Sequence, residues 1–396
     1  MTAIINRTPT GRIISLHSEL VYLSKLFGNS AFTLNDMKYD ANKKINPLMF
    51  FPLAIRHETL GIYDPYLRNP LSPAKFHLTQ SIQYDSQKSK SVSECFNAME
   101  GLGWLEKTTK GVKITPSGFE MASISYEDRN FLPLLRKSLL GYGVFIGFLY
   151  KCITHKNSED MVIKSKIKIG YPDTHEYIDA DGYRIPLSTG STKDTIVRTR
   201  ASLFAWAITS GFALPENVNY PKDKELWHVE ILQEIRKKNW NWHNIKVFIN
   251  ESIFDGTHNV TRPISYNWMT KSTKALRERG QAEIRINSME IENIVNNRRF
   301  GIVYLLGLAS ENDKTINFED IYNSMISHKD LFVINENGFK DALEIDMDIA
   351  TISGIPFMRD GGDIKPLTKI DMTYLRKEAP YELVEKLDQI FKEIQQ

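Results

Sequence analysis

This chain of 396 residues has few cysteines and almost no excess of one sign of charge over the other. Two cysteines, Cys95 and Cys152, are too few for a disulfide framework or a zinc site. Both lie among apolar residues, so we expect them in the core of a protein from a reducing compartment. The 50 Lys and Arg nearly balance the 48 Asp and Glu, and the net charge is +2. No field over the whole molecule indicates a polyanionic partner, so any such surface must be local.

Long apolar runs are also missing. The N-terminal segment has no continuous apolar stretch after its first charge, so we do not expect a signal peptide. Leu139 to Tyr150 is apolar, but it falls well short of the ~20 residues that a bilayer requires, and Arg136, Lys137 and Lys151 flank it. We therefore expect a buried helix here, no membrane partner and a cytoplasmic protein.

Several catalytic motifs are absent from the sequence. It has no glycine-rich phosphate loop, no paired-histidine zinc motif and no serine nucleophile elbow. Its nine histidines are scattered without companions at ligand spacing, so we expect them at the surface or in the core. Binding by this chain is therefore expected to need no cofactor.

One candidate for a Mg²⁺-dependent nuclease centre exists. Such centres need an Asp and, on an adjoining strand, an Asp or Glu followed two residues later by Lys. Asp363 and Lys365 have this spacing, with Asp346 or Asp348 as the other carboxylate. A glycine pair directly precedes Asp363, so a hairpin turn explains the same residues. A second group of carboxylates lacks the following lysine, and also lacks the closing Glu of a calcium loop: Asp173, Asp179 and Asp181.

The stretch from Lys88 to Ser123 has the clearest pattern of elements. Apolar residues recur at three- and four-residue steps from Val92 to Leu102, which predicts a helix, and Gly103 is placed to end it. Two short segments on either side of Lys110-Gly111 predict a hairpin, and Thr115-Pro116 can start a further helix. Helix, glycine, hairpin and helix follow one another in the order of a winged helix-turn-helix.

The predicted helix and hairpin suit duplex DNA. A helix fits the major groove, while a basic hairpin tip can lie on the neighbouring phosphates. Polar and basic side chains on or near both elements are therefore candidate DNA ligands: Lys88, Lys90, Ser93, Asn97, Lys107, Lys110 and Lys113. The alternative is a protein-binding module, because winged helices also serve that purpose.

A second unit of the same kind is predicted further along the chain, after a long helix from Phe131 to Ile153. Asp181-Gly182 lies between two β-rich segments and predicts a hairpin. A helix then follows Ser191 and ends at Gly211. Its basic residues extend the candidate DNA surface: Lys193, Arg198 and Arg200.

A third unit is predicted from Arg298 onward. Its helices and its hairpin are expected at residues 300–308, 318–325, 338–352 and 355–367. Tyr381 to Ile394 is expected to form a polar helix. No fixed-period sequence identity relates the three units, so the repeat is architectural. We therefore predict a mainly α fold with small β-hairpin wings (α+β), built of tandem winged helix-turn-helix units.

These patterns divide the chain into four parts. We expect winged-helix DNA-binding domains at 1–130 and 131–220, a connecting region at 221–297, and a third winged-helix-like domain at 298–396. Prolines from Pro47 to Pro73 predict an irregular path within the first part. The connecting region interleaves basic and aromatic residues, which can track phosphates and stack on bases. A solvated helix face with buried tryptophans explains that pattern as well.

Three features resemble the DNA-recognition region of FokI-like type IIS restriction endonucleases. Residues 101–106, GLGWLE, and 112–123, VKITPSGFEMAS, are similar to the end of the family's first recognition helix and to the wing and helix that follow it. Residues 204–213, FAWAITSGFA, resemble the family's tryptophan followed after four residues by a glycine and two apolar residues. The third feature is the order of three winged-helix-like units, which extends the resemblance over most of the chain.

The resemblance implies a base-reading surface on Ser93 and Asn97, where Asn97 replaces a basic residue. An asparagine can pair bidentately with adenine where an arginine chooses guanine, so the target sequence should differ. In the second unit, Lys193, Arg198 and Arg200 occupy the corresponding helix. The third unit of the family is implied to hold the nuclease domain, so here it would face a partner or the remaining protein.

These observations lead us to expect sequence-specific recognition of double-stranded DNA in a bacterial restriction-modification or defence system. The chain would equal the recognition half of a type IIS restriction endonuclease, and a separate nuclease or methyltransferase subunit would act on the DNA. Two alternatives stay open. In the first, the chain is itself a complete endonuclease with a Mg²⁺ site at Asp348, Asp363 and Lys365. In the second, it is a winged-helix transcription regulator, which an inverted-repeat target would favour.

Overall fold

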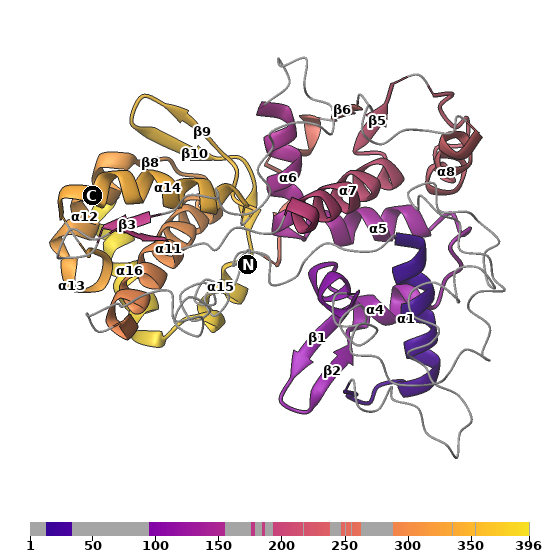
Figure 1. Cartoon of the computed structure of the whole chain (residues 1–396), viewed down its shortest axis with the longest axis horizontal. Coiled ribbons are helices and arrows are strands. Elements are labelled where there is room, and N and C mark those ends of the chain that lie inside the picture. Colours follow the sequence, from indigo (N-terminus) through magenta and orange to yellow (C-terminus); the bar gives the residue numbers. More distant parts are fainter. Residues whose placement is uncertain are drawn as a thin grey trace.

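The chain is mainly helical and carries small pairs of short strands (Figure 1). The computed structural model describes residues 13–33, 95–154, 176–178, 184–186, 193–216, 218–237, 247–249, 251–254, 256–262, 288–334, 336–352 and 354–395. These residues confirm the prediction of a mainly α fold with small β-hairpin wings. The proline-spaced segment lies outside them.

The first unit contains the elements that the sequence pattern predicts. It consists of α1 (Ile13–Phe27), the helical residues 95–101, β1 (Leu105–Thr108), β2 (Gly111–Ile114) and α4 (Pro116–Ala122). Gly103 follows the helix with φ +76°, a left-handed conformation that glycine adopts without strain, so the helix ends there. Pro116 is at the start of α4, where Thr115 Oγ1 accepts a hydrogen bond from the Gly118 amide at 3.0 Å.

A short stretch after α1 joins the hairpin of this unit. The amides of Phe32 and Val112 each donate to the other's carbonyl at 2.8 Å, which forms an antiparallel bridge to β2. Behind the hairpin, the buried Trp104 donates its indole N–H to Ser138 Oγ at 3.0 Å. Because Ser138 belongs to α5 (Phe131–Leu140), this bond attaches the first unit to the helix that follows it.

The prediction of one long helix from Phe131 to Ile153 is wrong. The chain forms α5 and then α6 (Gly143–Thr154), with a break at Gly141 and Tyr142. Arg262 explains the break, because its amide donates to the Gly141 carbonyl at 2.9 Å and its carbonyl accepts from the Gly143 amide at 3.1 Å. Backbone groups that would continue the helix are paired instead with a distant segment. Within the described residues, no helix combines the length and the apolarity that crossing a bilayer requires.

Of the elements predicted for the second unit, the helix is followed by one strand pair, while the predicted hairpin lies away from this helix, in the part of Figure 1 that holds the third unit. Strands β3 (Glu176–Ile178) and β4 (Arg184–Pro186) are antiparallel, as the hairpin prediction requires, although the turn itself lies outside the described residues. Helix α7 (Lys193–Ser210) ends before Gly211, which has φ +76°. Strand β5 (Ala213–Pro215) then pairs with β6 (Val247–Ile249), and α8 (Trp227–Lys237) lies between them in sequence.

The third unit is formed by consecutive helices and a hairpin. Its elements are α11 (Ser288–Glu311), β8 (Ile316–Asn317), α12 (Phe318–Ser327), α13 (Lys329–Phe332), η5 (Glu336–Gly338), α14 (Phe339–Ile352), β9 (Phe357–Asp360) and β10 (Asp363–Pro366). The strands form one antiparallel sheet in the order β8-β10-β9. The hairpin turns at Gly361 and Gly362 as predicted, with φ +61° at Gly361. The sequence pattern predicted that this unit begins at Arg298, but helix α11 already begins at Ser288.

Two further helices complete the core of the third unit. These are α15 (Met372–Glu378) and α16 (Tyr381–Ile394), and α16 has the bounds that the sequence predicts. It is more than a polar helix, because Leu383, Leu387 and Ile390 are buried while its other face is exposed. The residues recur at the spacing of one helix face, so α16 closes the core beside α11.

One segment connects the third unit to the rest of the chain. After η4 (Glu251–Phe254), strand β7 (Asn259–Val260) pairs in parallel with β11 (Lys369–Ile370), which precedes α15. The same segment continues to Arg262 at the α5–α6 break. At a neighbouring point, Gly354 approaches the backbone of Gly143 so closely that a side chain at Gly354 would collide with it.

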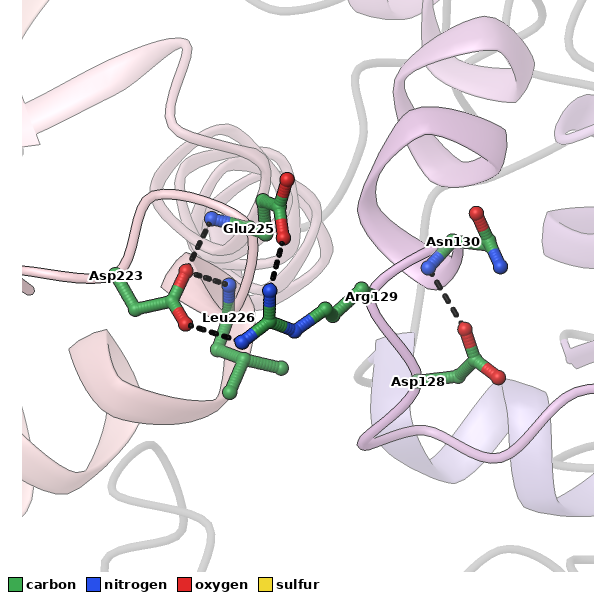
Figure 2. A network of polar contacts seen from close by, with 6 residues as sticks. All are labelled: Asp128, Arg129, Asn130, Asp223, Glu225 and Leu226. Carbon is green, nitrogen blue, oxygen red and sulfur yellow. Dashed lines mark hydrogen bonds and ion pairs between the residues drawn. The ribbon is translucent and has the colours of Figure 1, made fainter.

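An exposed network joins the end of the first unit to the start of α8 (Figure 2). Arg129, which precedes α5, donates to Glu225 Oε2 at 2.8 Å and contacts Asp223 Oδ2 at 3.4 Å. Asp223 also accepts a hydrogen bond from the Glu225 amide at 2.9 Å, which holds together the loop that carries both carboxylates. Two-thirds of the Arg129 side chain is exposed, and we expect this contact to add little stability.

Candidate nucleic-acid interface

Helical residues 95–101 have one buried face and one partly open face. Cys95, Phe96 and Met99 are buried, as is Ala98, whereas Asn97 is half-buried. Asn97 therefore occupies the open side of the helix, at the position that the sequence assigned to base reading. Lys88, Lys90 and Ser93 precede this segment and lie outside the described residues.

The β1–β2 hairpin has a tight turn at its tip. Thr108 pairs with Gly111 across the hairpin, and Thr109 and Lys110 form the turn. Thr108 Oγ1 donates to the Gly111 carbonyl at 3.1 Å and accepts from the Lys110 amide at 3.2 Å, so the threonine holds the turn. Gly111 has φ +127° and packs against the Phe32 backbone, which leaves no room for a larger residue. The tip is thus ordered and presents an exposed Lys110.

The three lysines of the hairpin have different surroundings. Lys107 forms an ion pair with Glu100 at 2.9 Å and ties the hairpin to the helix. Lys113 stands opposite Glu106 in the strand register and is only half-exposed. Lys110 is exposed at the turn, and the described part of the chain brings no ion pair to it. Of the three, Lys110 is therefore the best placed for a phosphate.

The basic residues of the second unit lie at the start of α7. Lys193, Arg198 and Arg200 all belong to this helix, and their side chains lie outside the described residues. The later half of α7 is buried from Leu203 to Ser210 and includes Trp206. The structure thus anchors the C-terminal half of α7 in the core.

In the third unit, basic residues of the β9–β10 hairpin and of the neighbouring helix α14 form ion pairs with carboxylates of the same unit. Arg359 of β9 donates two hydrogen bonds to Glu344 of α14, at 2.7 and 2.8 Å, and its guanidinium lies 4.5 Å from the centre of the Phe318 ring. The bonds to Glu344 raise the pKa of Arg359. Lys340 of α14 pairs in the same way with Glu319 of α12. Lys340 and Arg359, whose charges already have carboxylate partners, are poorly suited to phosphates, whereas Lys365 of β10 is exposed and forms no ion pair within the described residues.

The nuclease candidates are not assembled into a metal centre among the described residues. Asp346 is fully buried and accepts hydrogen bonds from the guanidinium groups of Arg298, at 2.6 Å, and Arg299, at 3.2 Å. Asp363 lies exposed on β10, where it accepts from Asn317 Nδ2 at 2.9 Å, and Lys365 is exposed on the same strand. The side chain of Asp348 lies outside the described residues, as do Asp173, Asp179 and Asp181.

Two histidines form part of a buried aromatic cluster. His17 of α1 and His228 of α8 each lie 4.9 Å from the ring of Phe131, measured between ring centres. Burial lowers the pKa of both histidines to about 4. The Nε2 atoms bond to backbone carbonyls, at 3.1 Å to Met121 and 2.5 Å to Tyr126. These histidines are neutral core residues, as we expected for histidines without companions.

Sequence reasoning missed two polar residues of this region, the buried Glu19 and the half-buried Arg262. Glu19 of α1 is fully buried, and burial raises its pKa to about 8 against the smaller opposing effect of a hydrogen bond with Cys95. Its spacing from Leu16 and Leu23 places it on the apolar face of α1, which is the signal that could have revealed it. Arg262 lies in a stretch without periodicity, so no local pattern indicates its role.

Comparisons with known proteins were made for the whole chain. No family model and no curated protein sequence matches it. Two solved structures are similar in fold. Both are of the restriction endonuclease FokI. The first shares 14% identity at a TM-score of 0.42 and matches 93% of this chain and 63% of FokI. The second, FokI bound to DNA, shares 13% identity at a TM-score of 0.43 and matches 99% of this chain and 68% of FokI. The chain thus spans about two thirds of FokI, and the similarity in fold is low.

Proposed function

We propose that this chain recognises a specific sequence in double-stranded DNA through tandem winged helices. It acts in a bacterial restriction-modification or defence system, in the cytoplasm, as the equivalent of the recognition half of a type IIS restriction endonuclease. Binding requires no cofactor, and a separate nuclease or methyltransferase subunit modifies the DNA.

The arrangement of helix 95–101 and its hairpin carries this proposal. The open side of the helix bears Asn97, and the adjacent tip bears the exposed Lys110. A helix in the major groove brings an amide side chain to base edges, while a lysine at the tip reaches the neighbouring backbone. The ion pair between Lys107 and Glu100 holds the two elements together, so base reading and phosphate contact come from one rigid surface.

The third unit supports the tandem arrangement. Helix α11, strand β8, helices α12 and α14 and the β9–β10 hairpin, with strand order β8-β10-β9, follow one another as the elements of a winged helix would, with the short α13 and η5 inserted between α12 and α14. In the second unit, α7 would be the reading helix, and the β5–β6 pair that follows it would form the wing in place of the hairpin predicted before the helix. The ion pairs of Lys340 and Arg359 suit contact with protein better than contact with phosphates, so we assign DNA to the first two units and a partner subunit to the third.

The main alternative is a complete endonuclease that uses Mg²⁺. Asp363 and Lys365 lie on one exposed strand, but Asp346 is held by two arginines inside the core and is not available to a metal ion. A centre would have to take its other carboxylate from Asp348 or elsewhere. A transcription regulator remains the third possibility, and it predicts an inverted-repeat target bound by a dimer.

Selection from random-sequence duplexes distinguishes these possibilities. The purified chain is mixed with the duplex library and Mg²⁺, and the bound fragments are sequenced and examined for breaks. We expect an asymmetric consensus and intact strands. Breaks at a fixed offset from the consensus would establish the endonuclease, and an inverted repeat would favour the regulator. Failure to bind any duplex at low salt, where phosphate contacts are strongest, would refute all three.

Two substitutions separate base reading from phosphate contact. Asn97→Ala should relax base preference at one position, a loss of about 1–3 kcal/mol of discrimination. Lys110→Ala should weaken binding to all duplexes alike and lower the slope of log affinity against log salt by about one. Titrations of the selected duplex and a scrambled duplex at several salt concentrations measure both effects. Lys329→Ala, an exposed lysine of the third unit, is the matched control and should change neither quantity. Similar behaviour of the Asn97 and Lys110 variants would refute this assignment of helix and wing.

A further inference from the structure

Arg262 joins the ends of two helices that belong to different parts of the chain. Its Nε donates to the carbonyl of Gly101, at the end of helix 95–101, at 2.8 Å. Its Nη2 donates to the carbonyl of Ser138, near the end of α5, at 2.5 Å. The third nitrogen, Nη1, donates to Thr261 Oγ1 at 2.8 Å and fixes the plane of the guanidinium.

The chemistry of a helix C-terminus explains why an arginine is suited to this place. The last carbonyls of a helix have no partner within the helix and carry the negative end of its dipole. A guanidinium offers donors in a rigid planar fork, so it can satisfy two such ends at once, which an ammonium group cannot do with the same geometry. The positive charge of Arg262 is therefore shared between the candidate reading helix and α5.

Two glycines make room for this side chain. A Cβ atom at Gly103 would lie 2.7 Å from the Arg262 guanidinium, and one at Gly141 would lie 2.6 Å from Nη2. Gly103 also needs its positive φ, but Gly141 has φ −74° and ψ −13°, which any residue can adopt. A glycine at position 141 is thus required by the guanidinium and not by the backbone.

The backbone of Arg262 belongs to the segment that reaches the third unit. Its amide and carbonyl pair with Gly141 and Gly143 at the α5–α6 break. Immediately before it, β7 pairs with β11, where the amides of Lys369 and Asp371 donate to the carbonyls of His258 and Val260 at 3.2 and 2.9 Å. One short segment thus contacts helix 95–101, α5 and the third unit.

We propose that Arg262 is a positioning residue that fixes helix 95–101 relative to the third unit and to α5, which contacts the candidate reading helix α7, so that the first two units read their DNA as one site of fixed spacing. The proposal rests on the function proposed above. Arg262 is not itself a DNA ligand in this role, because its donors are used by carbonyls and by Thr261.

Amide hydrogen exchange tests the coupling without DNA. In Arg262→Gln we expect the amides of residues 102–104 and of Asp371 to exchange about tenfold faster together, because both sites lose the same anchor. Gly141→Ala keeps the arginine and its charge but displaces the guanidinium, and it should reproduce the pattern. Arg129→Gln, which removes an exposed arginine contact between segments, is the matched control and should leave these amides unchanged. Faster exchange at residues 102–104 alone, or an equal change throughout the core of α11, would overturn the proposal.

Spacing tolerance tests the consequence for DNA. The selected duplex is compared with duplexes that carry one extra base pair between the part of the consensus read by the first unit and the part read by the second unit. We expect the insertion to weaken binding by the wild-type chain about tenfold, and to affect Arg262→Gln and Gly141→Ala much less, with an unchanged salt slope. Variants that remain as strict as the wild type would overturn the positioning role. If exchange becomes faster at both sites in the two variants but the wild-type chain binds no duplex, the proposed function is refuted and the coupling through Arg262 is established.

Discussion

Asp346→Asn should destabilise the protein by about 3–5 kcal/mol, because it leaves two buried guanidinium groups without their shared carboxylate. Asp346 lies on α14, and Arg298 and Arg299 are consecutive residues of α11, so the three side chains join the two helices at the centre of the third unit. All three are buried to within 1% of full burial. Water cannot replace the lost partner in such a place. Urea unfolding followed by circular dichroism measures the change in the free energy of unfolding.

Two further variants make this result specific. Glu344→Gln removes an exposed carboxylate from the same helix, where it pairs with Arg359, and should cost less than about 1 kcal/mol. Replacing the whole cluster, with Asp346→Leu, Arg298→Met and Arg299→Met, should restore much of the stability, because a packed apolar group needs no partner. A cost for Asp346→Asn no larger than that for Glu344→Gln would show that other groups stabilise the two arginines.

Glu19→Gln should stabilise the protein, and increasingly so as the pH rises. The pKa of Glu19 is about 8 in the folded protein, against an ordinary value of 4.5. Between these values the folded state holds a proton that the unfolded state has lost, so the free energy of unfolding falls by about 1.4 kcal/mol per pH unit as pH rises. A glutamine at this position escapes that loss. The difference between variant and wild type should therefore grow by roughly 4 kcal/mol from pH 5 to pH 8.

The difference in the free energy of unfolding between Glu19→Gln and the wild type isolates the contribution of Glu19. His17 and His228 have folded pKa values near 4, below the ordinary 6.5, so they destabilise the folded state as pH falls from about 6.5 toward 4. This loss occurs in both proteins and cancels. Glu120→Gln, at an exposed position of α4, is the matched control and should have a small effect at either pH. A stability difference for Glu19→Gln that stays constant from pH 5 to pH 8 would contradict the buried, protonated carboxyl.

Local elements were predictable because their signals are local. The hairpins at Lys110-Gly111 and at Gly361-Gly362, and helix α16, follow from residue periods and from glycines at turns. The break between α5 and α6 was not predicted, because Gly141 and Gly143 are the only local signal in an otherwise apolar stretch and the cause is a backbone segment more distant in the chain. Strands as short as β7 and β11 have no period to detect.

The candidate interface was predictable to a similar degree. Asn97 and Lys110 lie where the helix and hairpin pattern placed them, on an open helix side and at a turn. The ion pair of Lys107 with Glu100 and the half-exposed place of Lys113 depend on the strand register and on the helix end, which the residue types alone do not fix. Asp346 looked like a metal ligand because a sequence does not show which charges meet in a core. Its place beside Leu343 and Met347 on the apolar face of α14 was the available warning.

The parallel pairing of β7 with β11 has a consequence for how the molecule is made. These strands flank α11 to β10 in sequence, so that large part of the third unit must emerge from the ribosome before Asn259 can meet Lys369. Contacts between residues so far apart close late and slowly, because a long loop must be ordered first. Until then the segment that carries Arg262 lacks one of its two anchors. During synthesis the N-terminal units can therefore fold before their final mutual orientation is set, and completion of the third unit would be the event that sets it.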